Sequence, residues 1–246
     1  ILYASMYADI LKNVKNVTIE CDKRLLNIFQ KSFPNHSKQF VELGFVSNDI
    51  NKVVKKENII YAGSLGKYFR KNINDFKKEN YLFPDLKLVN VYSQKLKHYD
   101  GKYRIGISWK SFKNRYTVEK SLRLEDFNKI FEFENSSFFN FQYGNVQDEI
   151  NNFKNSFQTH INNIKDLNIH DDFDELAAAL MNLDLFITVS NSTAHLAGAL
   201  GVKTLLIKPV NHAVFHYWNQ YNEKTPWYRS ITLVSKDRII NEENLI

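Results

Sequence analysis

The stretch "LFITVSNSTAHLAGALGVKTLLIKP", residues 185–209, decides the fold predicted for this chain. Residues 185–189 are apolar apart from Thr188 and have the length of a buried strand, and residues 203–209 carry a second apolar run. Between them, residues 193–200 are mostly small and apolar, as in a tightly packed helix. The pattern predicts a strand, a helix and a second strand, with small polar residues, 190–192, in the turn after the first strand.

The same alternation of strands and helices extends along the rest of the chain. The predicted strands lie at residues 17–21, 39–43, 58–63, 103–109 and 137–144. The predicted helices lie at residues 2–13, 23–33, 85–102, 122–133, 148–160 and 173–183. Strands that alternate with helices of these lengths indicate parallel sheets covered by helices on both faces. We therefore predict an α/β fold with two halves, residues 1–98 and 99–246.

The composition limits the kind of protein. The chain has 246 residues, 43% of them hydrophobic, and no apolar run with the length of a membrane helix, so we expect a soluble protein. Its one cysteine, Cys21, excludes an internal disulfide framework and fits a reducing, cytoplasmic compartment. The net charge is +6, but the lysines are scattered among Asp and Glu. We therefore expect no nucleic-acid partner, whereas small anions such as nucleotide diphosphates fit this charge balance.

The polar turn at residues 190–192 predicts an anion site. In open parallel sheets, ligands bind where strands end and helices begin. The first backbone N–H groups of a helix are unpaired, the helix dipole adds partial positive charge, and small hydroxyl side chains let an anion approach closely. The same residues are also typical of an ordinary helix cap, and a lone His195 is typical of a partly buried histidine. Both interpretations stay open on this stretch alone.

Several segments occur in the order that one enzyme superfamily shows. They are "RIGISWKS" (104–111), "SLRLEDFNKIFEF" (121–133), "FFNFQYG" (138–144), "DDFDELAAALMNLDLFITVSNSTAHLAG" (171–198) and "PWY" (226–228). On these motifs the chain resembles the heptosyltransferase-like GT-B glycosyltransferases, and within them the bacterial group linked to tetratricopeptide repeats. The resemblance implies two Rossmann-like domains with a cleft between them. Residues 1–98 would face the acceptor and residues 99–246 would bind the nucleotide sugar.

The resemblance also implies an activity and a set of site residues. The activity is transfer of a sugar from a nucleotide-diphosphate donor to a hydroxyl of a glycan, lipid-linked or protein acceptor, with no metal or cofactor. The implied donor-binding residues are Lys110, Gln142, Tyr143, Ser190, Asn191, Ser192, Thr193 and His195. The implied walls of the cleft are Ser64, Trp109, Trp227 and Tyr228.

Further expectations follow from the same resemblance. The family's general base would lie in an acidic loop ahead of Ile1, so the catalytic residue is unknown and the activity of the fragment stays open. Many heptosyltransferases carry Asp-Thr where this chain has Ser190 and Asn191, so a carboxylate contact to the sugar would be missing. An N-terminal tetratricopeptide-repeat region in the full-length protein and a peripheral contact with the inner face of the membrane are also expected.

Other functions compete with this interpretation. A catalytically inactive module would keep the nucleotide-sugar pocket without the base. A serine hydrolase is suggested by "AGSLG" (62–66), which approximates a nucleophile elbow at Ser64, with Asp171 and His195 later in the chain. No oxyanion-loop motif precedes Ser64, which disfavours the hydrolase. The run "HAVFH" (212–216) lacks the glutamate of a zinc helix, so we expect no metal there.

Overall fold

The computed structural model describes residues 1–46, 55–99, 103–112, 117–157, 159–209, 215–218 and 223–241. Its strands are β1 Ile19–Cys21, β2 Phe40–Glu42, β3 Tyr103–Ser108, β4 Ser136–Asn140, β5 Ile161–Asn162, β6 Leu185–Val189, β7 Thr204–Ile207, β8 Lys224–Thr225 and β9 Tyr228–Val234. Its α-helices are α1 Tyr7–Asn13, α2 Lys23–Ser32, α3 Gly66–Phe69, α4 Leu86–Lys95, α5 Thr117–Lys120, α6 Asn128–Phe131, α7 Gln147–Phe157, α8 Phe173–Leu180, α9 Ser192–Leu200 and α10 Lys236–Asn241.

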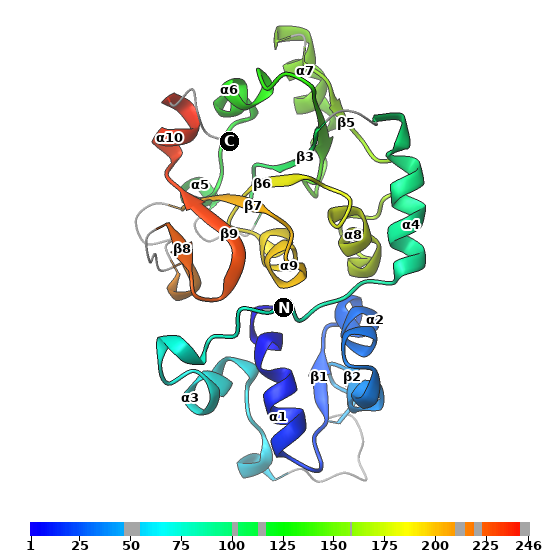
Figure 1. The fold of residues 1–246 in the computed structure, drawn as a ribbon, viewed down its shortest axis with the longest axis vertical. Helices are drawn as coiled ribbons and strands as arrows, with labels where there is room; N and C mark the ends of the chain where they lie inside the picture. The colour runs from blue at the N-terminus through cyan, green and yellow to red at the C-terminus, as the bar shows by residue number, and fades with distance from the viewer. Residues whose placement is uncertain are drawn as a thin grey trace.

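The second half of the chain builds a seven-stranded sheet in the order β5-β4-β3-β6-β7-β9-β8. Every neighbouring pair is parallel except β8 and β9. From β3 the chain adds β4 and β5 on one side, then returns to add β6, β7 and β9 on the other (Figure 1). This order is that of a doubly wound Rossmann-like sheet, whose direction of winding reverses between β3 and β6. The predicted α/β class with parallel sheets is confirmed.

The deciding stretch folds as predicted. All five residues of β6 are buried, as expected for a central parallel strand covered by helices on both faces. The helix α9 begins at Ser192, with Asn191 as its N-cap, because the Asn191 side chain accepts a hydrogen bond from the Ala194 N–H. It ends at Gly201, whose φ of 81° is a left-handed conformation that favours glycine at a helix C-terminus. The strand β7 follows.

One predicted strand does not form. Only residues 59–61 of this stretch run as irregular backbone, and the rest belongs to two 3-10 helices, η3 (Lys56–Asn58) and η4 (Ala62–Leu65). Ile59, Ile60 and Tyr61 are exposed, so they find no neighbouring strand in the described residues against which to pair. The first half therefore shows β1 and β2 as its parallel pair. The short strands β5 and β8 were missed because two residues are too few to show a pattern.

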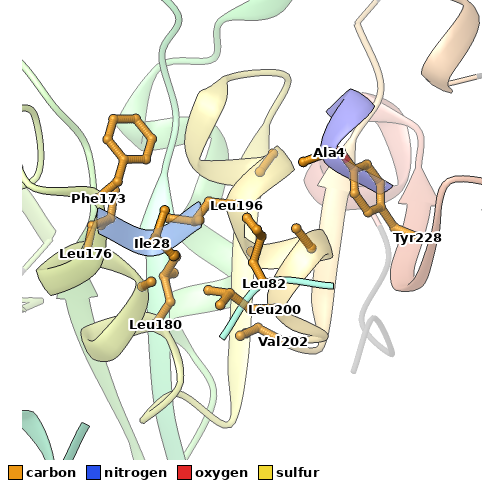
Figure 2. Close-up of a cluster of buried hydrophobic side chains, with 14 of the residues drawn as sticks. Ala4, Ile28, Leu82, Phe173, Leu176, Leu180, Leu196, Leu200, Val202 and Tyr228 are labelled. Carbon is orange, nitrogen blue, oxygen red and sulfur yellow. The ribbon is translucent and has the colours of Figure 1, made fainter. Parts of the chain in front are cut away.

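A shared core joins the two halves of the chain. The helices α8 and α9 cover the face of the large sheet that looks toward the first half, and α6, α7 and α10 cover the other face (Figure 1). Figure 2 shows Ile28 of α2 against Phe173, Leu176 and Leu180 of α8. Burying these side chains together fixes α2 against the second half. The helix α4, which belongs to the predicted domain 1–98, packs on α8 of the second half. The boundary between the two predicted domains stays a prediction.

The segment ahead of α4, which connects that helix to the preceding elements, also closes the C-terminal end of α9. The backbone N–H groups of Tyr81 and Leu82 both donate to the Ala199 carbonyl, at 3.1 and 3.3 Å. Leu82 packs near Leu200 at the same helix end (Figure 2). The connection therefore satisfies a carbonyl that a helix end would otherwise leave unpaired. In the part of the chain that the structure describes, no helix has both the length and the apolar character to cross a membrane.

Candidate functional site

The carboxyl ends of three neighbouring strands are tied together by side chains. The Asn191 amide after β6 donates to the Ser108 hydroxyl at the end of β3, at 2.8 Å. The Ser108 hydroxyl donates to Oε1 of Gln142, two residues beyond β4, at 3.1 Å. That oxygen also accepts from the backbone N–H groups of Trp109 and Lys110. The network lies where the winding of the sheet reverses, which is where open α/β sheets bind ligands.

A pocket of about 400 Å³ lies beside this network, at the N-terminus of α9. We call it the α9 pocket, and its described lining residues are Arg24, Ser111, Lys120, Tyr143, Ile169, His170, Phe173, Ser190, Asn191, Ser192, Thr193, His195 and Tyr217. They come from α2 in the first half and from the ends of several strands and helices in the second. The pocket therefore combines both halves of the chain.

One side of the α9 pocket suits an anion. Ser192 and Thr193 occupy the first turn of α9, where backbone N–H groups and the helix dipole favour negative charge. Lys120, the last residue of α5, brings a buried ammonium group whose Nζ lies 4.4 Å from the centre of the Phe215 ring. A lysine removed from bulk water interacts more strongly with an anion than an exposed one does.

The other side of the pocket is aromatic and carries a second cation. The rings of Tyr143 and His170 lie 6.5 Å apart at a tilt of 43°. Arg24 reaches the pocket from α2, where it donates to both carboxylate oxygens of Asp22 and to the His170 carbonyl. The hydrogen bonds from Arg24 lower the pKa of Asp22 to about 2. Arg24 also lies over the Phe173 ring, at 5.6 Å. This side offers flat apolar surfaces and a fixed guanidinium.

His195 is held in an aromatic cage at the edge of the α9 pocket. Its ring stacks on Trp218, with centres 4.8 Å apart and planes 13° from parallel. Its Nδ1 lies 2.8 Å from the Tyr228 hydroxyl, and Tyr217 packs edge-on against the ring. Burial among these rings disfavours the imidazolium and lowers the pKa of His195 to about 3. His195 is therefore neutral at physiological pH.

The structure brings together six of the eight predicted donor-binding residues. Those that line the α9 pocket are Tyr143, Ser190, Asn191, Ser192, Thr193 and His195. Four of them also have structural partners. His195 lies beside the Tyr228 hydroxyl, the Ser190 hydroxyl accepts from the indole N–H of Trp218 at 2.8 Å, and Asn191 caps α9. The Tyr143 hydroxyl accepts from the Phe112 N–H at 3.0 Å. Their roles toward a ligand stay predictions.

The other two predicted donor residues do not line the pocket. The Lys110 ammonium lies 2.6 Å from a carboxylate oxygen of Glu149 on α7. Gln142 is buried, and its side chain joins the ends of β3 and β4. Arg24 and Lys120 line the pocket although the sequence did not predict them as site residues. Neither follows a strand end directly, so no local pattern marked them.

The predicted cleft walls are distributed differently from the expectation. Trp109 is fully buried, with its indole N–H donating to Glu149, and Tyr228 is buried against His195. Trp227 lines a separate pocket on the other side of Tyr228. Ser64 lies in η4 and lines neither described pocket. A 3-10 helix, not a strand, surrounds Ser64, so the strand–turn–helix setting of a hydrolase elbow is missing there.

Metal-ligating residue types are dispersed. Within the described ranges, no three His, Cys, Asp or Glu side chains gather closely enough to hold a metal ion. His212 of the predicted His212–His216 pair lies outside the described residues. Cys21 is a buried thiol in β1. The expectation that the chain needs no metal or cofactor stays a prediction.

The comparisons with known proteins give distant likenesses. No family model matches the chain. The protein FlbA of Caulobacter vibrioides is 24% identical over 246 residues, which cover 94% of this chain and 40% of FlbA. The chain thus spans less than half the length of that relative. A solved structure of a family 9 glycosyl transferase from Veillonella parvula matches with a TM-score of 0.46 and 15% identity, over 63% of this chain and 42% of that one. Both likenesses lie below the level that assigns a family, so the chemistry of the α9 pocket must carry the functional conclusion.

Proposed function

We propose that the chain is the transferase part of a glycosyltransferase, which moves a sugar from a nucleotide-diphosphate donor to a hydroxyl of a glycan, lipid-linked or protein acceptor. The observation that carries the proposal is the α9 pocket: a helix N-terminus with Ser192, Thr193 and Lys120 on one side, and aromatic surfaces on the other. A nucleotide diphosphate has the same division into an anionic and a flat aromatic part.

The anionic side fits the demand that glycosyl transfer makes on an enzyme. When the bond between the sugar and the diphosphate breaks, negative charge grows on the departing phosphate oxygen. Preorganised N–H dipoles and a cation that point at this charge lower the barrier, most of all in a site that excludes water. The first turn of α9 supplies the dipoles and two hydroxyl groups, and Lys120 supplies the cation. We assign the diphosphate to this side.

The aromatic side fits the nucleoside. A base that packs against Tyr143 and His170 finds aromatic ring surfaces, and Phe173 also lines the pocket. Arg24 lies at the same side, and its bonds to Asp22 and to the His170 carbonyl hold its guanidinium in one orientation. A base or ribose oxygen is a suitable acceptor for such a fixed donor. The sequence predicted that Gln142 would lie near the nucleoside. In this proposal its side chain affects nucleoside binding indirectly, by holding the ends of β3 and β4 together.

No carboxylate lines the described part of the α9 pocket. Its lining includes neither Asp nor Glu, and the lowered pKa of His195 makes that residue a poor base near neutral pH. His170, the other histidine of the lining, belongs to the part assigned to the nucleoside. We propose that the general base lies outside the residues that line the α9 pocket. The same observation favours the second candidate, a module that binds a nucleotide sugar without transferring it.

Calorimetry tests the pocket itself. We expect at least one of UDP, ADP, GDP and dTDP to bind more tightly than its nucleoside, because the diphosphate adds charge-assisted contacts. Thr193→Val should weaken binding of that diphosphate and leave the nucleoside unaffected. Thr232→Val, on the half-buried strand β9 and outside the pocket, is the matched control. Equal affinities for every diphosphate and its nucleoside would remove the phosphate assignment and with it the transferase.

An activity assay separates the two candidates. The full-length protein is incubated with nucleotide sugars of each diphosphate that binds, and release of the nucleotide is followed with and without acceptor. Sugar-dependent nucleotide release identifies a transferase or donor hydrolase. Tight diphosphate binding without any release identifies the inactive binding module. The tetratricopeptide-repeat region, the membrane contact and the cytoplasmic location stay predictions.

A further inference from the structure

A second pocket, of about 250 Å³, lies on the far side of Tyr228 from the α9 pocket. We call it the Trp227 pocket. It is formed by residues of the 3-10 helix η1 (Leu2–Met6) and α1, by the segment from Phe76 to Phe83 ahead of α4, and by Trp227 before β9. The proposed donor site uses none of these residues.

The two pockets share a wall of three side chains. Tyr81 lines the Trp227 pocket and His195 lines the α9 pocket. Tyr228 lies close to both: its hydroxyl is 2.8 Å from Nδ1 of His195, and it interacts with the Tyr81 side chain. Burial raises the pKa of both tyrosines, so the wall stays uncharged. A ligand in one pocket is therefore separated from a ligand in the other by the thickness of this wall.

A row of aromatic rings also connects the pockets along the surface. Trp227 lies 6.2 Å from His216, His216 lies 5.0 Å from Tyr217, and Tyr217 lies 4.8 Å from His195, measured between ring centres. His216 is exposed, and Tyr217 and Trp227 are half-buried. We call His216, Tyr217 and Trp227 the aromatic ridge. It presents ring surface to solvent from one pocket to the other.

The charges around the Trp227 pocket cancel locally. Arg70 and Lys77 both pair with the carboxylate of Asp9, and Glu79 lines the pocket as well. The Arg70 guanidinium is further occupied by the carbonyls of Ser5 and Phe69. Cations already paired with carboxylates and carbonyls are poor sites for an anion, because a new anion would have to displace those partners. The pocket therefore favours a neutral ligand.

The remaining surface suits a sugar ring. Trp227 and Phe76 pack edge-to-face, 4.9 Å apart, and give the pocket a rigid aromatic wall. A pyranose has C–H faces that pack on such rings and hydroxyl groups on its edge that seek polar partners. Asn80, Lys77 and Glu79 line the polar side, and the buried Ser5 hydroxyl has no hydrogen-bond partner in the described structure. Apolar walls with a few polar groups are typical of small-molecule sites.

We propose that the Trp227 pocket binds one sugar ring of an acceptor glycan, and that the glycan follows the aromatic ridge to the α9 pocket. This inference rests on the proposed glycosyltransferase function, and it specifies the acceptor as a saccharide. Aromatic rings at intervals of 4.8–6.2 Å, each packed edge-on against the next, offer successive contacts to a short oligosaccharide. The hydroxyl at its end would then reach the donor sugar beside His195.

Tryptophan fluorescence tests the location directly. The chain has three tryptophans, and two of them, Trp109 and Trp218, are fully buried. Trp227 is half-buried, so a sugar that stacks on it should change its emission and protect it from quenching by acrylamide. The probes are maltotetraose, mannotetraose and chitotetraose, each added to the full chain with and without UDP. We expect a saturable change with at least one of them.

Variants tested by saturation-transfer NMR complete the experiment. Trp227→Ala should weaken tetrasaccharide binding about tenfold, since truncating an anchoring tryptophan typically costs this much. Trp227→Phe, which keeps an aromatic ring and preserves the fold, should lose about threefold. Tyr61→Ala is the control, because Tyr61 is an exposed aromatic residue outside both pockets, and its binding should match that of the unaltered protein.

Three outcomes would overturn the proposal. The first is that no tetrasaccharide binds, with or without UDP. The second is that Trp227→Ala binds the tetrasaccharides as tightly as the unaltered protein does. The third is that a serine-rich peptide binds through Trp227 while the sugars do not, which would indicate a protein acceptor. The nucleotide titration is a separate measurement. If tetrasaccharides bind through Trp227 but no nucleotide diphosphate binds, the saccharide site stands and the proposed transferase fails.

Discussion

The side-chain amide of Asn191 donates to the Ser108 hydroxyl across the point where the winding of the sheet reverses. The same Asn191 side chain accepts from the Ala194 N–H and so begins α9. A single residue therefore fixes the helix N-terminus to the end of the neighbouring strand. Because the α9 pocket depends on that position, the stability of the fold and the geometry of the site are linked at Asn191.

Replacing Asn191 tests this link. Asn191→Ala removes both hydrogen bonds and should lower the free energy of unfolding by about 1–3 kcal/mol. Asn191→Asp keeps the helix cap but cannot donate to Ser108, so its loss should be smaller. Urea unfolding measures both, with the exposed Asn13→Ala as control. An Asn191→Ala protein as stable as the unaltered chain would show that the helix start needs neither bond.

Replacing Lys120 and replacing Lys110 should affect diphosphate binding differently. Lys120→Met should weaken binding of a nucleotide diphosphate by about 1.5–3 kcal/mol and leave nucleoside binding unchanged, because it removes the charge that the proposed phosphate contact needs. Methionine keeps the apolar stem that packs in the protein. Lys110→Met should change diphosphate binding little, since Lys110 pairs with Glu149. A larger loss at Lys110 in calorimetry would instead support the assignment made from sequence.

The stability of the protein should fall in mild acid because of His195. Its pKa is about 3 in the folded state, against about 6.5 for an unperturbed histidine. Between these values the unfolded chain takes up a proton that the folded protein does not. The contribution of His195 is therefore complete above about pH 6.5 and is lost progressively as the pH falls toward 3.

His195→Gln isolates this contribution, since other titrating groups are the same in both proteins. Urea unfolding of the two proteins at pH 7.5, 6.0 and 5.0 gives the difference in free energy of unfolding at each pH. We expect that difference to shift in favour of the variant as the pH is lowered. A difference that is constant with pH would mean that His195 accepts a proton in the folded state.

Gly198 is required by the close approach of Tyr228 to α9. A Cβ atom at Gly198 would lie 2.5 Å from Cδ1 of Tyr228 and 2.6 Å from its Cγ. Gly198→Ala should therefore destabilise the fold by about 1–3 kcal/mol and shift the Tyr228 hydroxyl away from His195. Gly66→Ala, with no atom within 4 Å of the added carbon, should be neutral or slightly stabilising. Thermal unfolding compares them, and equal melting temperatures would contradict the packing argument.

The sequence predicted the elements that local patterns can specify. The apolar run of β6 and the small residues of α9 each depend on neighbours within a few positions. The alternation of strands and helices then fixed the α/β class, because parallel strands need crossover connections. The predicted strand at residues 58–63 was wrong because a strand forms only beside a second strand. The sequence of this segment alone does not indicate whether such a partner is present.

Only the tertiary structure decided which cations reach the site and where the aromatic residues lie. Lys110 follows a strand end, as the sequence argument required, but Glu149 of α7 packs beside it and pairs with it. Lys120 and Arg24 reach the α9 pocket instead, from a short helix and from the other half of the chain. Burial and charge pairing depend on residues far apart in sequence, and these are set by how the layers pack. The sequence by itself therefore determined the central strands and the polar turn between them. The packing of distant elements decided which charged and aromatic side chains surround that turn.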